Sequence, residues 1–292
     1  MIVDRSCFLR GRTRTGVLLI HGLGGTPAEM VHLGRSLYGT GAHVLCCQLA
    51  GHCGTEEQLA GTGWRDWYAS AEAALTRLSE SCDTVIVGGL SMGAVLAARL
   101  AREEPERVQG LVLLAPTLRY DGWAMPRFSF LLRGLVHLPF GRRYRFREQE
   151  PFGIKDPRIR RWVQKSLTTP GNLDAGLEAT PALAIREMWR LVADMRGTLL
   201  EIRQDTLLIH AREDDVASLR NAFHFQRHLG GRVETLVLED SYHIITVDRQ
   251  RQVVNRRVAD FVRQFGDRDL APLSVAPEMA ADNDAGGLRD AV

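Results

Sequence analysis

One serine stands where a strand-like run meets a helix-like run, and its neighbours suit a nucleophile. The run Val85–Val87 is β-branched and apolar, two glycines follow, and small and apolar residues recur at helical spacing after Ser91. The pattern Gly89-x-Ser91-x-Gly93 is that of a nucleophile elbow, a tight turn that holds the serine in strained geometry. Glycines suit such a turn because strand and helix come too close for side chains. The pattern predicts a nucleophile at Ser91; an inert serine in a glycine-rich turn is the alternative.

A serine hydroxyl is a weak nucleophile at neutral pH, so a histidine base and an orienting carboxylate are needed. Of the nine histidines, His243 is the predicted base because it follows the last strand-like run, at the edge where a parallel sheet gathers its ligands. Asp214 is the predicted acid because it opens the turn after the strand-like run that ends at His210. The alternatives for the acid are Asp215, Glu213 and, in an earlier loop, Asp121.

A second glycine-rich turn, His21–Gly25, follows the apolar run Val17–Ile20. Such a loop can turn backbone N–H groups towards a developing oxyanion. The predicted donors are the N–H of Leu23 and the N–H of Met92, the residue after the nucleophile. A plain strand-to-helix turn is the alternative.

Short apolar runs alternate with amphipathic helical patterns along most of the chain. This alternation predicts a parallel sheet covered by helices on both faces. Thr26 as helix cap, Pro27 at the first helical position and Glu29 form a capping box that predicts a helix after the second glycine-rich turn. The predicted strands are 17–20, 43–49, 85–87, 108–114, 206–210 and 233–238. Further predicted helices are 64–80, the run from the elbow to 104, 219–229 and 247–265.

The alternation stops between residues 118 and 198, where no strand is predicted and only 159–167 and 181–195 have helical patterns. We interpret 118–198 as a helical cap inserted between two parts of a core, 1–117 and 199–265, and 266–292 as a disordered tail. The stretch Trp123–Leu132 is rich in aromatics and methionine, which favours a lipophilic substrate. The basic run Arg142–Arg147 is interpreted as a solvated face or hinge, with nucleic-acid or membrane-surface binding as the alternative.

Bulk properties limit the class of protein. The 292 residues are 45% hydrophobic and 25% charged with a net charge of +2, which is ordinary for a globular chain and gives no strong field for polyanions. No apolar run is long enough to span a bilayer, and the N-terminus lacks the pattern of a secretory signal. The five cysteines lack metal-ligand spacing, so we predict no metal and a reducing cytoplasm.

Taken together, these segments resemble the α/β-hydrolase superfamily and, within it, small bacterial carboxylesterases and monoacylglycerol-lipase-like serine hydrolases. The matching segments are 21–27, 51–54, 89–93, 211–216 and 241–248. The resemblance implies the α/β-hydrolase fold, a mostly parallel doubly wound sheet with a helical cap insertion. It also supports Asp214, because the acid in that family is an aspartate followed by one residue and an apolar Val or Met. The chain departs from the family at Tyr242 and Cys53, where glycine is frequent.

These features predict a cofactor-independent hydrolase of carboxylic esters that works through an acyl-enzyme. We expect a small, lipophilic ester substrate, no nucleic-acid partner, no stable membrane insertion, and a monomer or homodimer. A thioesterase, an acyltransferase or a carbon–carbon bond hydrolase could use the same triad. A non-catalytic binding module is a further alternative, although it would normally lack a triad member. Residues expected to line the pocket are His21, Gly22, His52, Trp123 and Tyr242.

Overall fold

The computed structural model describes residues 2–125, 136, 141–168 and 176–266. The predictions made for residues 126–132 of the aromatic stretch and for the tail from residue 267 fall outside these residues. The last helix ends at Gly266, one residue beyond the predicted end of that helix.

A seven-stranded sheet runs through the molecule in the order β1-β3-β2-β4-β5-β8-β9. Strand β1 pairs with β3 in antiparallel fashion, and the other neighbouring strands of this sheet are parallel. The bounds are β1 Cys7–Leu9, β2 Thr15–Ile20, β3 His43–Cys47, β4 Thr84–Leu90, β5 Gly110–Leu114, β8 Asp205–Ala211 and β9 Val233–Leu238. The predicted mostly parallel sheet is therefore confirmed. The extra strand β1 is too short to leave a periodic pattern.

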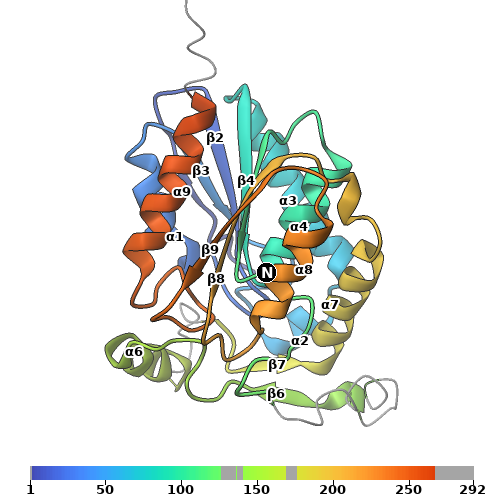
Figure 1. Cartoon of the computed structure of the whole chain (residues 1–292). Helices are drawn as coiled ribbons and strands as arrows, with labels where there is room; N and C mark the ends of the chain where they lie inside the picture. The colour runs from blue at the N-terminus through green and yellow to red at the C-terminus, as the bar shows by residue number, and fades with distance from the viewer. Residues whose placement is uncertain (1, 126–135, 137–140, 169–175, 267–292) are drawn as a thin grey trace, which may run out of the picture.

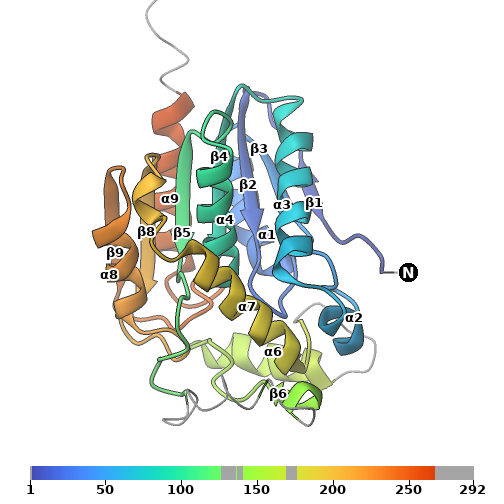
Figure 2. The ribbon, with the colours of Figure 1, turned by 90° about the vertical axis from the view of Figure 1, so that its right-hand side faces the viewer.

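Helices cover both faces of the sheet (Figures 1 and 2). Helices α1 (Ala28–Tyr38) and α9 (Arg251–Gly266) pack on one face, over a core cluster that includes Leu19, Cys46 and Ile86. Helices α3 (Trp64–Ser79), α4 (Met92–Glu103) and α8 (Leu219–His228) contribute to the core cluster of the other face. Strands β2, β4 and β5 are buried along their whole length, which explains why they read as unbroken apolar runs.

The segment between β5 and β8 places its residues 141–168 beyond the edge where the parallel strands end (Figure 1) and its residues 182–195 beside α3 and α4. It holds the short helix η2 (Gly141–Arg143), α6 (Pro157–Thr168), α7 (Ala182–Met195) and the short helix η3 (Leu199–Glu201). It also holds a two-stranded sheet of β6 (Arg145–Arg147) and β7 (Ala179–Pro181), so the prediction of a strand-free segment is wrong. Strands of three residues carry too little alternation to be recognised. Helix α2 spans Glu56–Ala60.

The predicted start of α1 is confirmed in part, and that of α9 is wrong. Helix α1 spans Ala28–Tyr38, but Pro27 already has the helical angles φ −53° and ψ −23°, and the hydroxyl of Thr26 accepts the N–H of Ala28 at 3.3 Å. The carboxylate of Glu29 accepts the backbone N–H of Gly22 at 3.1 Å instead of closing a capping box with Thr26. Helix α9 begins at Arg251, four residues later than predicted, because residues 244–250 form hydrogen-bonded turns.

Within the described residues, the helices are all too short or too polar to cross a membrane.

Candidate active site

The elbow holds Ser91 between the end of β4 and the first residue of α4. Its backbone has φ 57° and ψ −115°, a region that side-chain-bearing residues rarely occupy, and its N–H donates to the carbonyl of Leu114 at 2.9 Å. A Cβ at Gly89 would overlap the backbone of Gly93, and a Cβ at Gly93 would overlap the carbonyl of Ile20. The two glycines therefore allow α4 to begin directly after β4, and this tight turn places the serine at its apex.

Three side chains from three separate loops meet at this apex. The Oγ of Ser91 lies 2.9 Å from Nε2 of His243, and Nδ1 of the same ring lies 2.7 Å from Oδ2 of Asp214. The three residues expose 9%, 3% and 3% of their surface respectively, so water barely competes for these hydrogen bonds. The other oxygen of Asp214 accepts the N–H groups of Val216 and Ala217 at 2.8 and 2.7 Å. These two bonds fix the carboxylate in the orientation that the histidine needs.

The charges of this trio support one another. Burial disfavours the protonated form of His243, but the facing Asp214 carboxylate outweighs it and raises the pKa of the imidazole. Burial likewise opposes ionisation of Asp214, but the charge and hydrogen bond of His243 hold the pKa of this carboxyl below its usual value. The buried His210 donates from Nε2 to the carbonyl of Ala217 at 2.7 Å, and the same nitrogen lies 3.3 Å from Oδ2 of Asp214. Burial lowers the pKa of this imidazole.

The other carboxylates considered for the acid have different partners. Asp215 accepts the backbone N–H of His243 at 3.2 Å and that of Gly153 at 3.1 Å, so it holds the histidine loop rather than the ring. Glu213 forms an ion pair with Lys155. Asp121 accepts hydrogen bonds from Ser218 and Asn221 at the start of α8. Asp214 is the carboxylate that reaches the imidazole.

The loop predicted to hold the oxyanion lies against the serine. A Cβ added to Gly22 would lie 3.6 Å from the Cβ of Ser91 and 3.7 Å from Oε2 of Glu29, so this glycine stands between the two side chains. Burial raises the pKa of the Glu29 carboxyl to about 7, although its hydrogen bond from Gly22 opposes the shift. Met92 opens α4, so its N–H has no partner within the helix. Leu23 is half-buried in the same loop as Gly22.

Two buried histidines contact each other and the loop that holds Gly22. The ring of His21 accepts the N–H of Leu49 at Nε2, so its Nδ1 donates to the carbonyl of Gly22 at 2.8 Å. The ring of His52 packs edge-on at 4.9 Å, and burial lowers the pKa of His21 to about 4 and that of His52 to about 3. Both side chains are fully buried, so they support the loop and do not line an open pocket as expected.

The structure adds a residue that the sequence prediction missed. The hydroxyl of Thr117 lies 3.1 Å from Oγ of Ser91 and donates to the carbonyl of Ala115 at 3.2 Å. Thr117 is fully buried just beyond β5, the strand beside the elbow strand. Its place after a strand that ends at the same edge as the elbow was the signal available in the sequence.

Two aromatic side chains expected at the pocket pack against each other and contact the chain next to triad residues. Tyr242 precedes the histidine, and its ring packs edge-on against Trp123 with 5.4 Å between centroids. Trp123 is 60% exposed and donates from its indole to the carbonyl of Glu213. Among the described residues, no cluster of three or more His, Cys, Asp or Glu side chains could hold a metal ion.

The sequence was compared with models of known protein families. Residues 11–250 match the family described as Serine aminopeptidase, S33. The chain belongs to this family. Within the S33 family, it is 28% identical over 247 residues to a thermostable monoacylglycerol lipase of Bacillus sp. (strain H-257), covering 84% of this chain and 89% of that protein. It is 26% identical over 252 residues to a carboxylesterase of Bacillus subtilis (strain 168), covering 85% and 92%.

Solved structures share the architecture of this S33 chain, which is that of the α/β hydrolases. A structure from a study of LipS and LipT, two metagenome-derived lipolytic enzymes, superposes with a TM-score of 0.74 at 28% identity, covering 89% of this chain and 97% of that one. The monoacylglycerol lipase of Paleococcus ferrophilus superposes with a TM-score of 0.71 at 16% identity, covering 90% and 99%. At 16% identity the likeness establishes the fold alone.

Proposed function

We propose that the protein is a serine hydrolase that cleaves carboxylic esters through an acyl-enzyme intermediate. The hydrogen-bonded chain from Ser91 through His243 to Asp214 carries this proposal. Nε2 of His243 takes the hydroxyl proton while Oγ attacks the ester carbonyl, and the ring then gives that proton to the leaving alcohol. Water, activated by the same nitrogen, attacks the acyl-enzyme and releases the acid. Asp214 keeps the ring in the correct tautomer and stabilises the imidazolium.

The tetrahedral intermediate needs donors for its oxyanion. We assign this role to the backbone N–H groups of Leu23 and Met92, because the first lies in the loop packed on Ser91 and the second opens α4 without an intrahelical partner. The start of α4 also places the positive end of a helix dipole at this point. Loss of one such donor typically costs about 3 kcal/mol of barrier stabilisation.

A lipophilic ester is the substrate class that the relatives and the site favour together. The relatives carry the names monoacylglycerol lipase and carboxylesterase, and the Trp123–Tyr242 pair supplies aromatic surface on the loops that carry Asp214 and His243. A panel of p-nitrophenyl esters of increasing acyl length, with matched thioesters and amino-acid p-nitroanilides, tests this assignment. We expect turnover of the esters to depend on acyl length. Faster turnover of the thioesters or the anilides would redirect the assignment to a thioesterase or an aminopeptidase.

The nucleophile is tested with a fluorophosphonate probe, which reacts with activated serines. Wild type and Ser79→Ala, a change at the end of α3, should be labelled equally, and Ser91→Ala should not be labelled. An unlabelled wild type would contradict the catalytic proposal, and a labelled Ser91→Ala would contradict the choice of nucleophile.

A cytoplasmic location and a monomer or homodimer complete the proposal. The location is supported by the five cysteines, all of which are free thiols.

A further inference from the structure

Charge is divided unevenly along this chain. Residues 118–198 hold 15 Lys and Arg against 8 Asp and Glu, a net charge of +7, whereas the rest of the chain carries −5. The overall charge of +2 therefore hides a strongly basic segment, and residues 141–168 of this segment lie at the edge of the molecule that holds the triad (Figure 1). An uneven field of this kind orients a protein towards an anionic partner.

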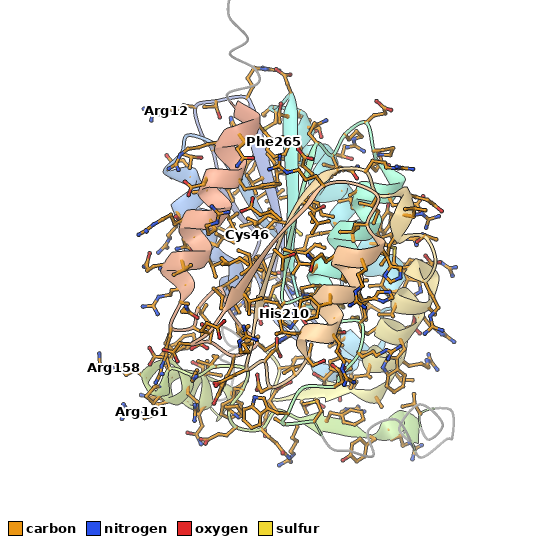
Figure 3. All side chains as sticks on the ribbon, viewed as in Figure 1. Arg12, Cys46, Arg158, Arg161, His210 and Phe265 are labelled. Carbon is orange, nitrogen blue, oxygen red and sulfur yellow. The ribbon has the colours of Figure 1, made fainter. Side chains whose placement is uncertain are left out.

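Helix α6 presents part of this charge to solvent. Arg158, Arg161, Trp162 and Lys165 are exposed and follow the spacing i, i+3, i+4, i+7, so they share one stripe of the helix, which we call the α6 face. Figure 3 shows Arg158 and Arg161 pointing away from the protein. Trp162 is 53% exposed. Guanidinium and ammonium groups beside an indole are the side chains that settle at a lipid–water interface.

The segment before α6 is fastened to the loops of the triad. The backbone N–H groups of Lys155 and Asp156 donate to the carboxylate of Asp248 at 2.8–3.0 Å, and that carboxylate also accepts the N–H of Tyr242. The carbonyl of Gly153 accepts the N–H of Ile244, next to the catalytic histidine, at 2.7 Å. A contact made by the α6 face therefore has a fixed position relative to the active site.

We propose that the α6 face docks the protein on an anionic lipid surface, so that the active site works beside the interface that holds its lipophilic ester. The positive charge of the segment favours an anionic surface. Trp162 favours a lipid surface, because burying an indole in the headgroup region is energetically favourable. The inference rests on the proposed function for its purpose. Nucleic acid, the other common polyanion, is distinguished by the experiment.

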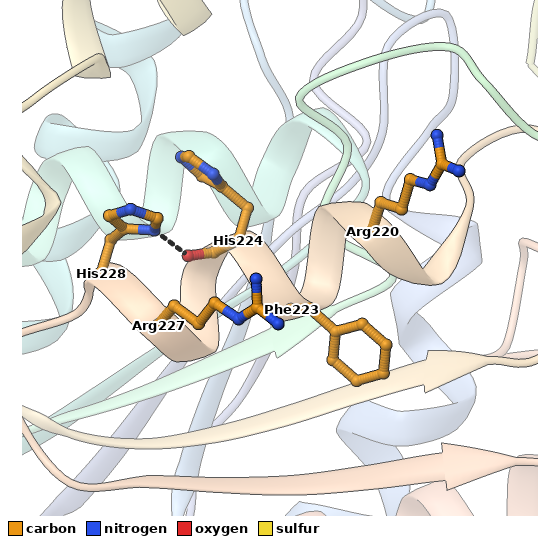
Figure 4. A pocket seen from close by; sticks show the side chains of 5 residues that line it. All are labelled: Arg220, Phe223, His224, Arg227 and His228. Carbon is orange, nitrogen blue, oxygen red and sulfur yellow. Dashed lines mark hydrogen bonds between the residues drawn. The ribbon is translucent and has the colours of Figure 1, made fainter.

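The test measures sedimentation with vesicles of phosphatidylcholine alone and of phosphatidylcholine mixed with phosphatidylglycerol. The test variant is Arg158→Glu/Arg161→Glu. The matched control is Arg220→Glu/Arg227→Glu, which reverses two charges at a shallow surface pocket of about 230 Å³ on α8 (Figure 4). Each cation near an anionic surface contributes roughly fivefold in affinity, so reversal of two should weaken binding by more than about tenfold.

We expect wild type and the α8 variant to bind the anionic vesicles and not the neutral ones, and the α6 variant to lose binding. A blue shift of tryptophan emission on binding should shrink in Trp162→Phe. Equal loss in both charge variants, no binding by wild type, or equally tight binding to poly(U) RNA would overturn the inference.

Hydrolysis of a water-soluble ester, p-nitrophenyl acetate, separates this inference from the function on which it rests. The α6 variant should keep the wild-type rate on this substrate, which also shows that it is folded. A wild type that binds anionic vesicles but hydrolyses no ester would contradict the proposed function and leave the docking surface standing. A wild type that hydrolyses esters but ignores the vesicles would contradict the docking surface alone.

Discussion

Replacement of Asp214 by asparagine should nearly abolish activity because the local hydrogen bonds fix the direction of the new amide. In the native protein, Oδ1 of Asp214 accepts the N–H groups of Val216 and Ala217, while Oδ2 faces Nδ1 of His243. In Asp214→Asn, the amide oxygen must keep the two backbone donors, which turns the NH₂ group towards the ring. His243 then has to accept at Nδ1, so its proton moves to Nε2, where it faces Ser91 and cannot take the hydroxyl proton.

The expected loss is about 10⁴-fold in kcat, as for a triad whose histidine is held in the wrong tautomer, or about 5.5 kcal/mol of transition-state stabilisation. Steady-state hydrolysis of p-nitrophenyl butyrate measures it. Asp215→Asn is the matched control, because its amide oxygen can still accept a backbone N–H from the histidine loop, and we expect a loss below about tenfold. A loss of less than about a hundredfold in Asp214→Asn, or a larger loss in Asp215→Asn, would refute the assignment of the acid.

Three further predictions concern the base, the oxyanion loop and the elbow. The pKa of His243 is raised, and only the neutral ring can accept a proton, so kcat/KM should rise with pH through an inflection above 6.5. An inflection well below pH 6.5 would contradict the pairing of His243 with Asp214. Glu29→Ala should lower kcat by about tenfold with little change in KM, whereas Glu29→Gln, whose amide oxygen can still accept the N–H of Gly22, should restore it. Equal kinetics of the two variants would argue against a positioning role. Gly93→Ala should reduce the free energy of unfolding in urea by about 2 kcal/mol or more, because the new Cβ would overlap backbone atoms. Gly61→Ala, where a Cβ has ordinary space, should change this free energy by less than about 0.5 kcal/mol. Similar values for the two variants would contradict the close approach of strand and helix at Gly93.

Local sequence was enough where chemistry depends on neighbours along the chain. The elbow can be recognised from five residues because its two glycines and Ser91 are close in the chain and their backbones are in contact. The buried parallel strands can be recognised from unbroken apolar runs, because burial on both faces is written in the residues of each strand itself. Elements of three residues, such as β6 and β7, were missed because their pairing partners, and not their own pattern, stabilise them.

The partners of polar side chains were decided by the tertiary structure. Glu29 has the sequence position of a capping residue, yet it binds the N–H of Gly22, which the fold brings within reach. Thr117 has no motif of its own and reaches Ser91 only because β5 lies beside β4. A hydrogen bond requires its donor and acceptor to be placed within a few tenths of an ångström, and the sequence of a loop does not fix positions that closely.

The sequence by itself predicted a nucleophile, a base and an acid in an α/β-hydrolase fold, because the residue types and their places after strands are local properties. It left four carboxylates as candidates for the acid. In the tertiary structure, a carboxylate oxygen of Asp214 lies 2.7 Å from the imidazole of His243, whereas Asp215 accepts the backbone N–H of His243. Adjacent carboxylates are nearly identical in sequence terms, and only the direction in which the folded backbone points each one separates their roles.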